Sequence, residues 1–326
     1  MKILIIRLSS IGDIVLTTPV VRCLKQQTSA TLHYLCKASM KAVVETNPHI
    51  DSIHTYRKHD PGLWKRLESE HFDFVVDLQG NCVSKRLCRR LSVPHAAFPK
   101  CNFRKLLLVL FKWNVMPERH IVDRYFDAVS ALGVKNDLQG LEFFVDAEDE
   151  QELAAAALPP AYVAVAVGSR HGTKQLPQDM LESVVAQSRL PMALLGDASD
   201  AVVGETIHSR YPEKTYNLCG RLSLRASAAC VAHAQTVLAG DTGLMHIAAA
   251  FHKRIVSVWG NTVPAFGMYP YLPQHQELSI LMENRHCRCR PCSKLGFRRC
   301  PLKHFRCMRD IPMQDIIHQL NANESE

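Results

Sequence analysis

The sequence predicts an α/β protein of two lobes, each built on a parallel sheet that helices cover on both faces. Short apolar runs alternate with amphipathic segments, and this alternation restarts after a double proline. Of the 326 residues, 47% are apolar and 21% are charged, which is typical of globular proteins, and the length favours two domains. The formal net charge of +8 favours an acidic ligand or a phosphate-rich surface.

The first half of the chain contains four short apolar runs, each typical of a buried parallel strand. These strands are expected at residues 2–7, 30–36, 50–56 and 72–78. Helices are expected at residues 14–25, 40–45, 61–69, 84–91, 121–132 and 146–158. Pro19 is expected either to kink the first helix or to mark its true first turn. Gly133 is expected to end the fifth helix, because glycine is the usual residue at a helix C-terminus.

Pro159 and Pro160 stop the last of these helices and indicate a domain hinge. We therefore expect an N-terminal lobe of residues 1–158 and a C-terminal lobe of residues 159–326. In the second lobe, strands are expected at residues 162–167, 192–195, 236–239 and 255–259, and helices at residues 178–187, 224–232 and 244–251. Two such halves facing one another are expected to enclose a cleft.

The first apolar run bears on where the protein is located. Arg7 interrupts this run after too few residues for the core of a secretory signal. No stretch approaches the roughly 18 uncharged apolar residues of a membrane-spanning helix. We therefore expect a cytoplasmic protein, whose twelve cysteines are mostly thiols.

The most specific local pattern lies at residues 240–250, where a strand is expected to turn into an alanine-rich helix. A helix N-terminus offers free N–H groups and a partial positive charge, and Gly243 permits close approach of a ligand. With Asp241 and Thr242 at the turn and His246 one turn later, these features favour a phosphate-binding site. A plain strand–helix turn explains the same residues. The glycine spacing matches neither the dinucleotide-binding motif nor the P-loop.

A second pattern is the polar loop at residues 168–177, which follows a strand at the sheet edge where open α/β sheets bind ligands. Ser169 supplies a hydroxyl group, and Lys174 supplies a cation that can neutralise a diphosphate. A solvated surface loop is the alternative interpretation.

A third pattern is the turn after the first strand, which contains Ser10, Gly12 and Asp13. A carboxylate at the first strand–helix turn is suited to take a proton from a hydroxyl group. The alternative is that Asp13 only complements the dipole of the helix that follows.

In combination, these segments closely resemble glycosyltransferase family 9, the ADP-heptose:lipopolysaccharide heptosyltransferases. The resemblance is carried by the turn at residues 9–13, the segments 174–177 and 220–224, and Asp-Thr-Gly-x-x-His at residues 241–246, in the right order over almost the whole chain. It implies a GT-B type α/β fold, with two Rossmann-like lobes whose parallel sheets face a central cleft. It also implies an inverting, metal-independent transfer of a heptose or related sugar from an ADP-sugar to the lipopolysaccharide inner core, without a cofactor.

The resemblance further implies roles for single residues. Asp13 would be the catalytic base, and Ser10, Gly12 and Arg124 would lie on the acceptor side. The donor would be held by Ser169, Lys174, Asp200, Leu222, Asp241, Thr242, Gly243 and His246. Within this set, Leu222 would lie near the adenine and Asp200 on the ribose hydroxyls. Arg225 stands where many relatives carry Glu, which leaves the nucleotide and sugar of the donor open.

A basic block lies between Lys85 and Arg119, where nine Lys or Arg residues accompany a single acid, Glu118. Basic residues that flank the apolar run at residues 106–111 can bind an anionic membrane surface. The resemblance places an anionic lipid A-core acceptor on this lobe, so we expect peripheral contact with the cytoplasmic face of the inner membrane. A solvated amphipathic helix is the alternative.

The segment 285–309 is basic and rich in cysteine. Its five cysteines are candidates for a structural zinc site, because four thiolates bind zinc tetrahedrally: Cys287, Cys289, Cys292, Cys300 and Cys307. Their spacing is not that of a standard zinc ribbon, so free thiols or disulfides stay open. The nine Lys and Arg residues of this segment are expected to lower the pKa values of the thiols. Nucleic acid is disfavoured as a partner, because no aromatic platform or known module accompanies the cysteines.

Two other functions are compatible with the same sequence features. A sugar-nucleotide epimerase of GT-B fold would convert the donor without an acceptor. A non-catalytic nucleotide-sugar-binding protein on the same scaffold would bind the nucleotide but not turn it over.

Overall fold

The computed structural model describes residues 1–322, which form two compact units. One unit contains residues 1–101 and 119–144, and the other contains residues 102–118 and the chain from Val145 onward. Residues 323–326 of the expected second lobe lie outside the described part. Contacts within the chain therefore separate the two units after Phe144 and assign residues 102–118 to the second unit. The expected domain boundary after residue 158 stays a prediction.

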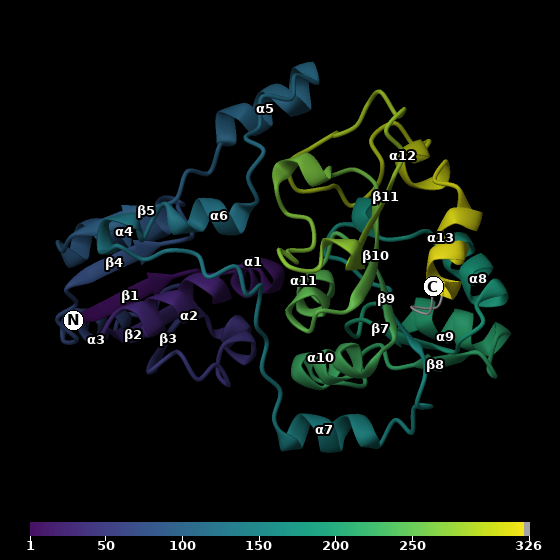
Figure 1. The fold of residues 1–326 in the computed structure, drawn as a ribbon, viewed down its shortest axis with the longest axis horizontal. Helices are drawn as coiled ribbons and strands as arrows, with labels where there is room; N and C mark the ends of the chain where they lie inside the picture. The colour runs from purple at the N-terminus through teal and green to yellow at the C-terminus, as the bar shows by residue number, and fades with distance from the viewer. Residues whose placement is uncertain (323–326) are drawn as a thin grey trace. The chain divides into compact units, whose positions relative to one another are not determined.

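The first unit is built on a five-stranded parallel sheet with the strand order β3-β2-β1-β4-β5 (Figure 1). Its strands are β1 (Lys2–Ile6), β2 (Thr31–Lys37), β3 (Ser52–Tyr56), β4 (Phe74–Asp77) and β5 (His95–Ala97). The helices of this unit are α1 (Ile11–Val15), α2 (Thr18–Gln27), η1 (Ala38–Val43), α3 (Leu63–Glu68), α4 (Cys82–Leu91), α6 (Ile121–Phe126) and η2 (Ser130–Leu132). Residues 3–6 of β1 are fully buried, which explains why this run is apolar on both faces.

The second unit is built on a six-stranded parallel sheet with the order β11-β10-β9-β6-β7-β8. Its strands are β6 (Val163–Ala166), β7 (Met192–Leu195), β8 (Thr215–Asn217), β9 (Thr236–Gly240), β10 (Arg254–Trp259) and β11 (Ser279–Glu283). Its helices are α5 (Asn102–Phe111), α7 (Ala147–Ala154), η3 (Gly172–Lys174), α8 (Gln178–Gln187), α9 (Ala201–Arg210), α10 (Leu224–His233), α11 (Gly243–Ala250), η4 (Pro264–Phe266), η5 (Gln276–Leu278), α12 (Arg306–Arg309) and α13 (Met313–Asn321).

Each sheet reverses its strand order at one place. In the first unit β1 lies between β2 and β4, and in the second unit β6 lies between β7 and β9. At such a reversal the loops that follow two neighbouring strands leave in opposite directions and open a crevice at the carboxyl edge, where open α/β sheets bind ligands. The loops after β1, β6 and β9, where the sequence placed candidate residues, therefore lie at these reversals, whereas the loop after β4 carried no predicted site residue.

The structure refines several expected helices. The helix expected at residues 14–25 is two helices, α1 and α2, and Pro19 lies in the first turn of α2, as one of its two expected placements required. The helix expected at residues 40–45 is the 3₁₀ helix η1. The helix expected at residues 121–132 is α6 followed by the separate 3₁₀ helix η2, and Gly133, with φ 73°, caps η2 at its C-terminus. Among the described residues, no helix has the length and apolar character needed to cross a membrane.

Arg225 fastens α7 to α10 within the second unit. Its Nη2 lies 3.1 Å from Asp146 Oδ2 and its Nε lies 3.1 Å from Asp149 Oδ1. Asp146 also caps α7 by accepting hydrogen bonds from the N–H groups of Glu148 and Asp149. The Asp149 side chain is only 4% exposed, so protein groups replace water around its carboxylate: Arg225, and the Asp146 N–H group at 2.9 Å. Arg225, which stands where many relatives carry Glu, therefore points toward the start of α7.

We expect Arg225→Met to lower the free energy of unfolding by about 3 kcal/mol, because it leaves the buried Asp149 carboxylate without its cation. Urea unfolding followed by circular dichroism measures this change. Arg221→Met is the matched control, since Arg221 is 65% exposed and lies 4.0 Å from Glu205, where an ion pair contributes about 0–1 kcal/mol. Equal stability losses in the two variants would contradict the assigned role of Arg225.

Candidate functional site

Asp13 lies in the first turn of α1, the helix that follows β1, and is held in place by three groups. Its Oδ2 accepts hydrogen bonds from Ser10 Oγ at 2.7 Å and from Ser10 N at 3.1 Å. Its Oδ1 lies 2.5 Å from Arg7 Nη2. Ser10 is the N-cap of α1, so the geometry of a helix start fixes the carboxylate. The Asp13 side chain remains 21% exposed and is therefore accessible to a substrate hydroxyl group.

Arg7 is the buried cation behind Asp13. Its Nε donates to Ser9 O at 3.1 Å, its Nη1 donates to Leu78 O, and its guanidinium lies 5.9 Å from the centre of the Tyr125 ring. Burial lowers the pKa of Arg7, but the charge of Asp13, the neighbouring Tyr125 and Tyr34, and the hydrogen bond to Asp13 together outweigh burial, so the net pKa is raised. Arg7 therefore stays charged and orients the carboxylate.

The loops after β4 and β5 contribute further polar groups to this edge of the sheet. Gln79 accepts a hydrogen bond from Leu8 N at 2.8 Å, while Asp77 accepts from the N–H groups of Gln79 and Gly80. Burial and the charge of Arg7 lower the pKa of Lys100, and the charges of Asp77 and Asp13 oppose this shift. Its side chain packs so closely on Gly80 that a Cβ there would lie 3.1 Å from Lys100 Cε. No sequence pattern indicated Lys100, Gln79 or Arg7 as a site residue.

The other predicted acceptor-side residues differ in their surroundings. Gly12 is buried in the first turn of α1, and Ser10 is exposed at its start. Arg124 lies on α6 and is only 1% exposed. The structure does not place the Arg124 side chain on the surface, so its contact with an acceptor stays a prediction.

In the second unit, Lys174 and Asp241 form an ion pair at the reversal of strand order. Lys174 Nζ lies 2.7 Å from Asp241 Oδ2, which also accepts a hydrogen bond from Thr262 Oγ1 at 2.8 Å. The side chains are 16% and 11% exposed. Lys174 follows β6 and Asp241 follows β9, and these strands are neighbours. The two patterns that the sequence singled out separately therefore form one site.

The N-terminus of α11 opens beside this ion pair. Thr242 is its N-cap, and Thr242 Oγ1 is buried without a hydrogen-bond partner in the part of the chain that the structure describes. Gly240 brings the two loops together, because a Cβ there would lie 2.2 Å from Lys174 O. Gly243 is the first residue of α11. His246, one turn later in the same helix, is buried and only 2% exposed. Free N–H groups, a hydroxyl group and a lysine thus surround one place suited to phosphate.

Asp200 and Leu222 line two separate cavities of the second unit. Asp200 borders a cavity of about 170 Å³ together with Val167, Gln175 and Phe305. Leu222 borders a cavity of about 320 Å³ that Tyr216 also lines. The structure therefore does not bring the expected adenine and ribose contacts into one cavity.

Glycines make room for Asp200. Its carboxylate occupies the space that a Cβ on Gly168 or Gly196 would fill, at 1.7 Å and 2.7 Å from its Oδ2. Burial raises the pKa of Asp200, while a hydrogen bond from Asp197 N partly opposes this shift. Ser169, next to Gly168, accepts a hydrogen bond from Gln175 Nε2 at its carbonyl oxygen.

The basic segment 285–309 packs against both loops of this site. Arg290 donates to Gly260 O at 2.6 Å and to Thr262 O at 2.9 Å, and pairs with Glu283 at 2.8 Å. Phe297 N donates to Thr173 Oγ1 at 2.8 Å, and Thr173 N donates to Phe297 O at 3.1 Å. Through Thr262 and Thr173 the segment therefore supports the direct neighbours of Asp241 and Lys174, which the sequence did not indicate.

All five cysteines of this segment are free thiols. Cys287 Sγ lies 3.5 Å from Cys289 Sγ, which lies 3.8 Å from His304 Nε2. In the described chain, these sulfur atoms do not form a group of three ligands within 4.8 Å, so structural zinc here stays a prediction. The expected lowering of thiol pKa values is wrong: burial raises the pKa of Cys292 to about 11 and that of Cys307 to about 12. Desolvation outweighs the nearby basic side chains.

Residues 62–297 match the family described as glycosyltransferase family 9 (heptosyltransferase). The chain belongs to glycosyltransferase family 9. Its fold is of the GT-B type, as the solved structures of this family confirm.

Individual relatives share this family. The chain is 33% identical over 109 residues to lipooligosaccharide heptosyltransferase 2 of Haemophilus influenzae, over 32% of this chain and 31% of that protein. It is 24% identical to lipopolysaccharide heptosyltransferase 3 of Escherichia coli, over 82% and 88%. The match to this H. influenzae protein, and the matches to lipooligosaccharide heptosyltransferase 2 of two Campylobacter jejuni strains, each span about a third of the relative's length. The structure of E. coli ADP-heptose LPS heptosyltransferase II superposes with a TM-score of 0.76 at 19% identity, over 98% of both chains.

Proposed function

We propose that this protein transfers a heptose from an ADP-heptose donor to the inner core of lipopolysaccharide. The observation that carries the proposal is the Lys174–Asp241 ion pair beside the N-terminus of α11, in a chain of family 9. A donor diphosphate would bind there, because both Lys174 and the free N–H groups of the helix favour an anion.

The leaving diphosphate needs positive charge as its bond to the sugar breaks. Lys174 supplies a full charge, and the start of α11 supplies a partial one. When the diphosphate binds, it competes with Asp241 for Lys174, and Thr262 continues to hold Asp241 by its hydroxyl group. This arrangement supports transfer without a metal ion, since the protein itself provides the compensating charge.

Asp13 would act as the base. It takes the proton of the acceptor hydroxyl group while that oxygen forms a bond to the anomeric carbon, and the bond from this carbon to the diphosphate breaks. Attack opposite to the leaving group inverts the anomeric configuration. Arg7 keeps the Asp13 carboxylate in place, and Ser10 fixes its orientation.

Two other functions are distinguished by turnover. A sugar-nucleotide epimerase would convert the donor in the absence of any acceptor. A non-catalytic binding protein would bind ADP without consuming ADP-heptose. Retention of a positioned carboxylate at Asp13 and a cation at Lys174 favours the transferase over both.

We expect Asp13→Asn to lower kcat at least about 100-fold while ADP affinity changes less than about twofold, because the base acts only on the acceptor. Transfer of heptose to a lipid A-core acceptor and calorimetric titration with ADP measure the two effects. Asp127→Asn is the matched control, since this carboxylate pairs with Arg119 on the surface. An Asp13→Asn protein with full transferase activity would exclude the mechanism.

We expect Lys174→Met to weaken ADP binding about 10-fold or more, because a hydrogen bond to a charged group contributes about 1.5–3 kcal/mol. Titration of the wild type with ADP, UDP and GDP, each with and without magnesium, should show a preference for ADP that magnesium does not change. Lys58→Met, at an exposed lysine of the other unit, is the control. A preference for UDP or GDP would assign another donor, and unchanged ADP binding by Lys174→Met would remove the diphosphate site.

Membrane contact would involve α5 and the chain that follows it. Phe103 and Trp113 are 71% and 63% exposed, and further large apolar side chains exposed in this stretch are Leu106, Leu110, Phe111 and Val115. Arg104 and Lys105 flank them. An exposed apolar face with basic neighbours is suited to the boundary between lipid head groups and acyl chains.

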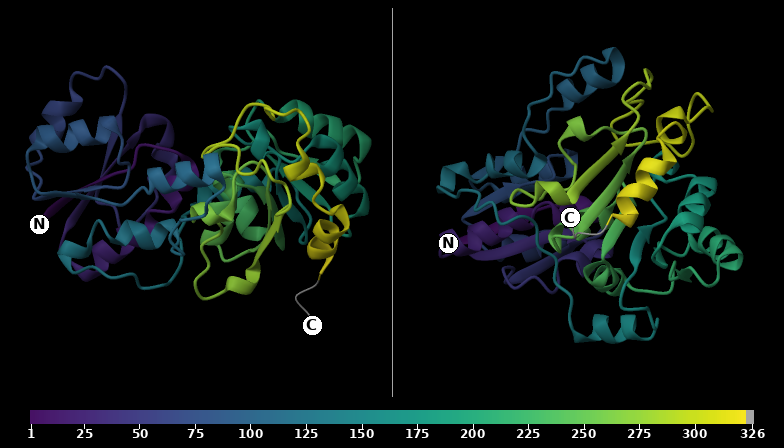
Figure 2. Two further views of the ribbon diagram at one scale, coloured as in Figure 1. Left: turned by 90° about the horizontal axis from the view of Figure 1, so that it is seen from above. Right: turned by 45° about the vertical axis from the view of Figure 1, so that its right-hand side comes forward.

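The segment 285–309 extends this surface. Lys112 Nζ donates to Cys289 O at 3.0 Å and to Pro291 O at 2.8 Å, which joins the end of α5 to the basic segment (Figure 2). Leu295 and Leu302 of this segment are 68% and 59% exposed. The segment contains no acidic residue, so the combined surface attracts anionic lipid. We therefore place the protein at the cytoplasmic face of the inner membrane, where its lipid-linked acceptor would be reached.

We expect the protein to sediment with phosphatidylglycerol-containing vesicles and not with pure phosphatidylcholine vesicles, and added salt should weaken the binding. Leu110→Glu should lower the bound fraction about 10-fold, since it adds charge to the apolar face. Val202→Glu, at a 75% exposed apolar residue on α9, is the matched control and should bind as the wild type does. Equal binding by both variants would exclude α5 as the membrane contact.

A further inference from the structure

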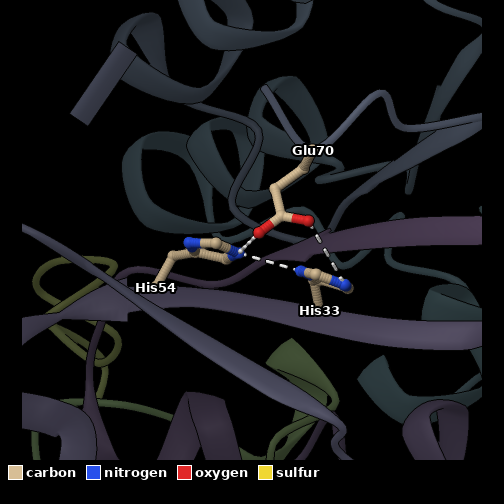
Figure 3. Close-up of side chains that lie close together, drawn as sticks. All are labelled: His33, His54 and Glu70. Atoms are coloured by element: carbon tan, nitrogen blue, oxygen red, sulfur yellow. Dashed lines mark hydrogen bonds and ion pairs between the residues drawn. The ribbon is translucent and has the colours of Figure 1, made fainter. Parts of the chain in front are cut away.

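Three side chains of metal-binding type converge in the first unit, on residues that the proposed reaction does not use. They are His33 on β2, His54 on β3 and Glu70 in the turn between α3 and β4 (Figure 3). One ligand atom from each lies within 4.8 Å of the others. The parallel register pairs His33 with Ser52 and Leu35 with His54, so the two histidines stand on neighbouring strands, two register positions apart and therefore on the same face of the sheet.

The spacing of these atoms is close to that of ligands around a shared ion. His33 Nδ1 and His54 Nε2 are 2.9 Å apart, and Glu70 Oε1 lies 4.0 Å from His54 Nε2. Nitrogen and oxygen ligands lie about 2.0–2.2 Å from zinc, so two of them at a tetrahedral angle are about 3.4 Å apart. The observed values fall on either side of this distance, and side-chain shifts of about half an ångström would satisfy it.

Hydrogen bonds to the two histidines do not explain why Glu70 faces them, since its hydrogen bond is to Lys2. Its oxygen atoms lie 3.9 Å from His33 Nε2 and 4.0 Å from His54 Nε2, which is too long for hydrogen bonds. Yet Figure 3 shows the carboxylate turned toward both rings. Lys2 Nζ holds Oε2 at 2.9 Å, which leaves Oε1 directed at His54. Such an outer partner is what orients a metal-binding carboxylate.

The surroundings of the two rings are rigid. The rings are stacked with an interplanar angle of 14°, and Phe72 packs edge-on against both of them. The side chains of His33 and His54 are 6% and 10% exposed, whereas Glu70 is 29% exposed. An ion would therefore enter from the side of Glu70, and a water molecule could complete its coordination there.

We propose that His33, His54 and Glu70 bind one divalent first-row transition-metal ion, with zinc as the fitting example. Imidazole and carboxylate ligands suit such ions. The ion would join the edge strand β3 to β2 and to the turn before β4. His33 aligns with Leu4 in the middle of β1, whereas Asp13 follows the carboxyl end of that strand, so the ion has a structural role and takes no part in the transfer.

The full chain, freed of metal with EDTA, should take up one equivalent of zinc or cobalt at this site. Glu70→Gln and His54→Ala should each weaken binding by more than about 100-fold, since loss of even an outer partner costs 10–100-fold. His233→Ala, at an exposed histidine of the other unit, is the matched control and should leave binding unchanged. Glu70→Gln keeps the shape of the side chain, so it tests the site even where His54→Ala fails to fold.

The absorption spectrum of the cobalt-loaded protein separates this site from the cysteine-rich segment. Cobalt at His33, His54 and Glu70 gives visible d–d bands without sulfur-to-cobalt charge transfer, whereas thiolate ligands add that charge-transfer band. The proposal is overturned if the chain binds neither ion, if Glu70→Gln binds as the wild type does, or if all bound cobalt shows sulfur charge transfer.

Discussion

Both units depend on the same constraint, which is set where a parallel sheet reverses its strand order. The loops after two neighbouring strands separate there, and the carboxyl edge between them must be kept both open and ordered. In each unit a single ion pair meets this requirement: Arg7 with Asp13 in one, and Lys174 with Asp241 in the other. The surrounding hydrogen bonds, from Ser10 in the first unit and Thr262 in the second, serve to fix the acidic partner.

Much of this organisation was predictable from the sequence. The parallel sheets follow from apolar runs buried on both faces, and Asp13, Lys174 and Asp241 were found because polar residues stand directly after such runs. The sequence could not show that Lys174 and Asp241 touch, because 66 residues and three strands, β7, β8 and β9, lie between them in the chain. Long-range pairing of this kind depends on strand order, which periodicity does not encode.

Other features were hidden for different physical reasons. β5, β8 and β11 are short or half-buried, so they lack the apolar signature of the central strands. Arg290 looked like one basic residue among nine, yet it is buried against the backbone after β10. The basic side chains of its segment also failed to acidify the thiols, because desolvation is a property of packing and not of composition.

The hydrogen bonds between Phe297 and Thr173 carry a consequence for biosynthesis. Lys174 emerges from the ribosome long before the segment that supports its loop, because more than a hundred residues separate them in the chain. Domains fold from the N-terminus as synthesis proceeds. A nascent chain can thus complete the sheet that contains β6 and β9 while the loops that hold Lys174 and Asp241 still lack their final support. The contacts between these loops and the basic segment 285–309 therefore form only after all strands of both sheets have been synthesised.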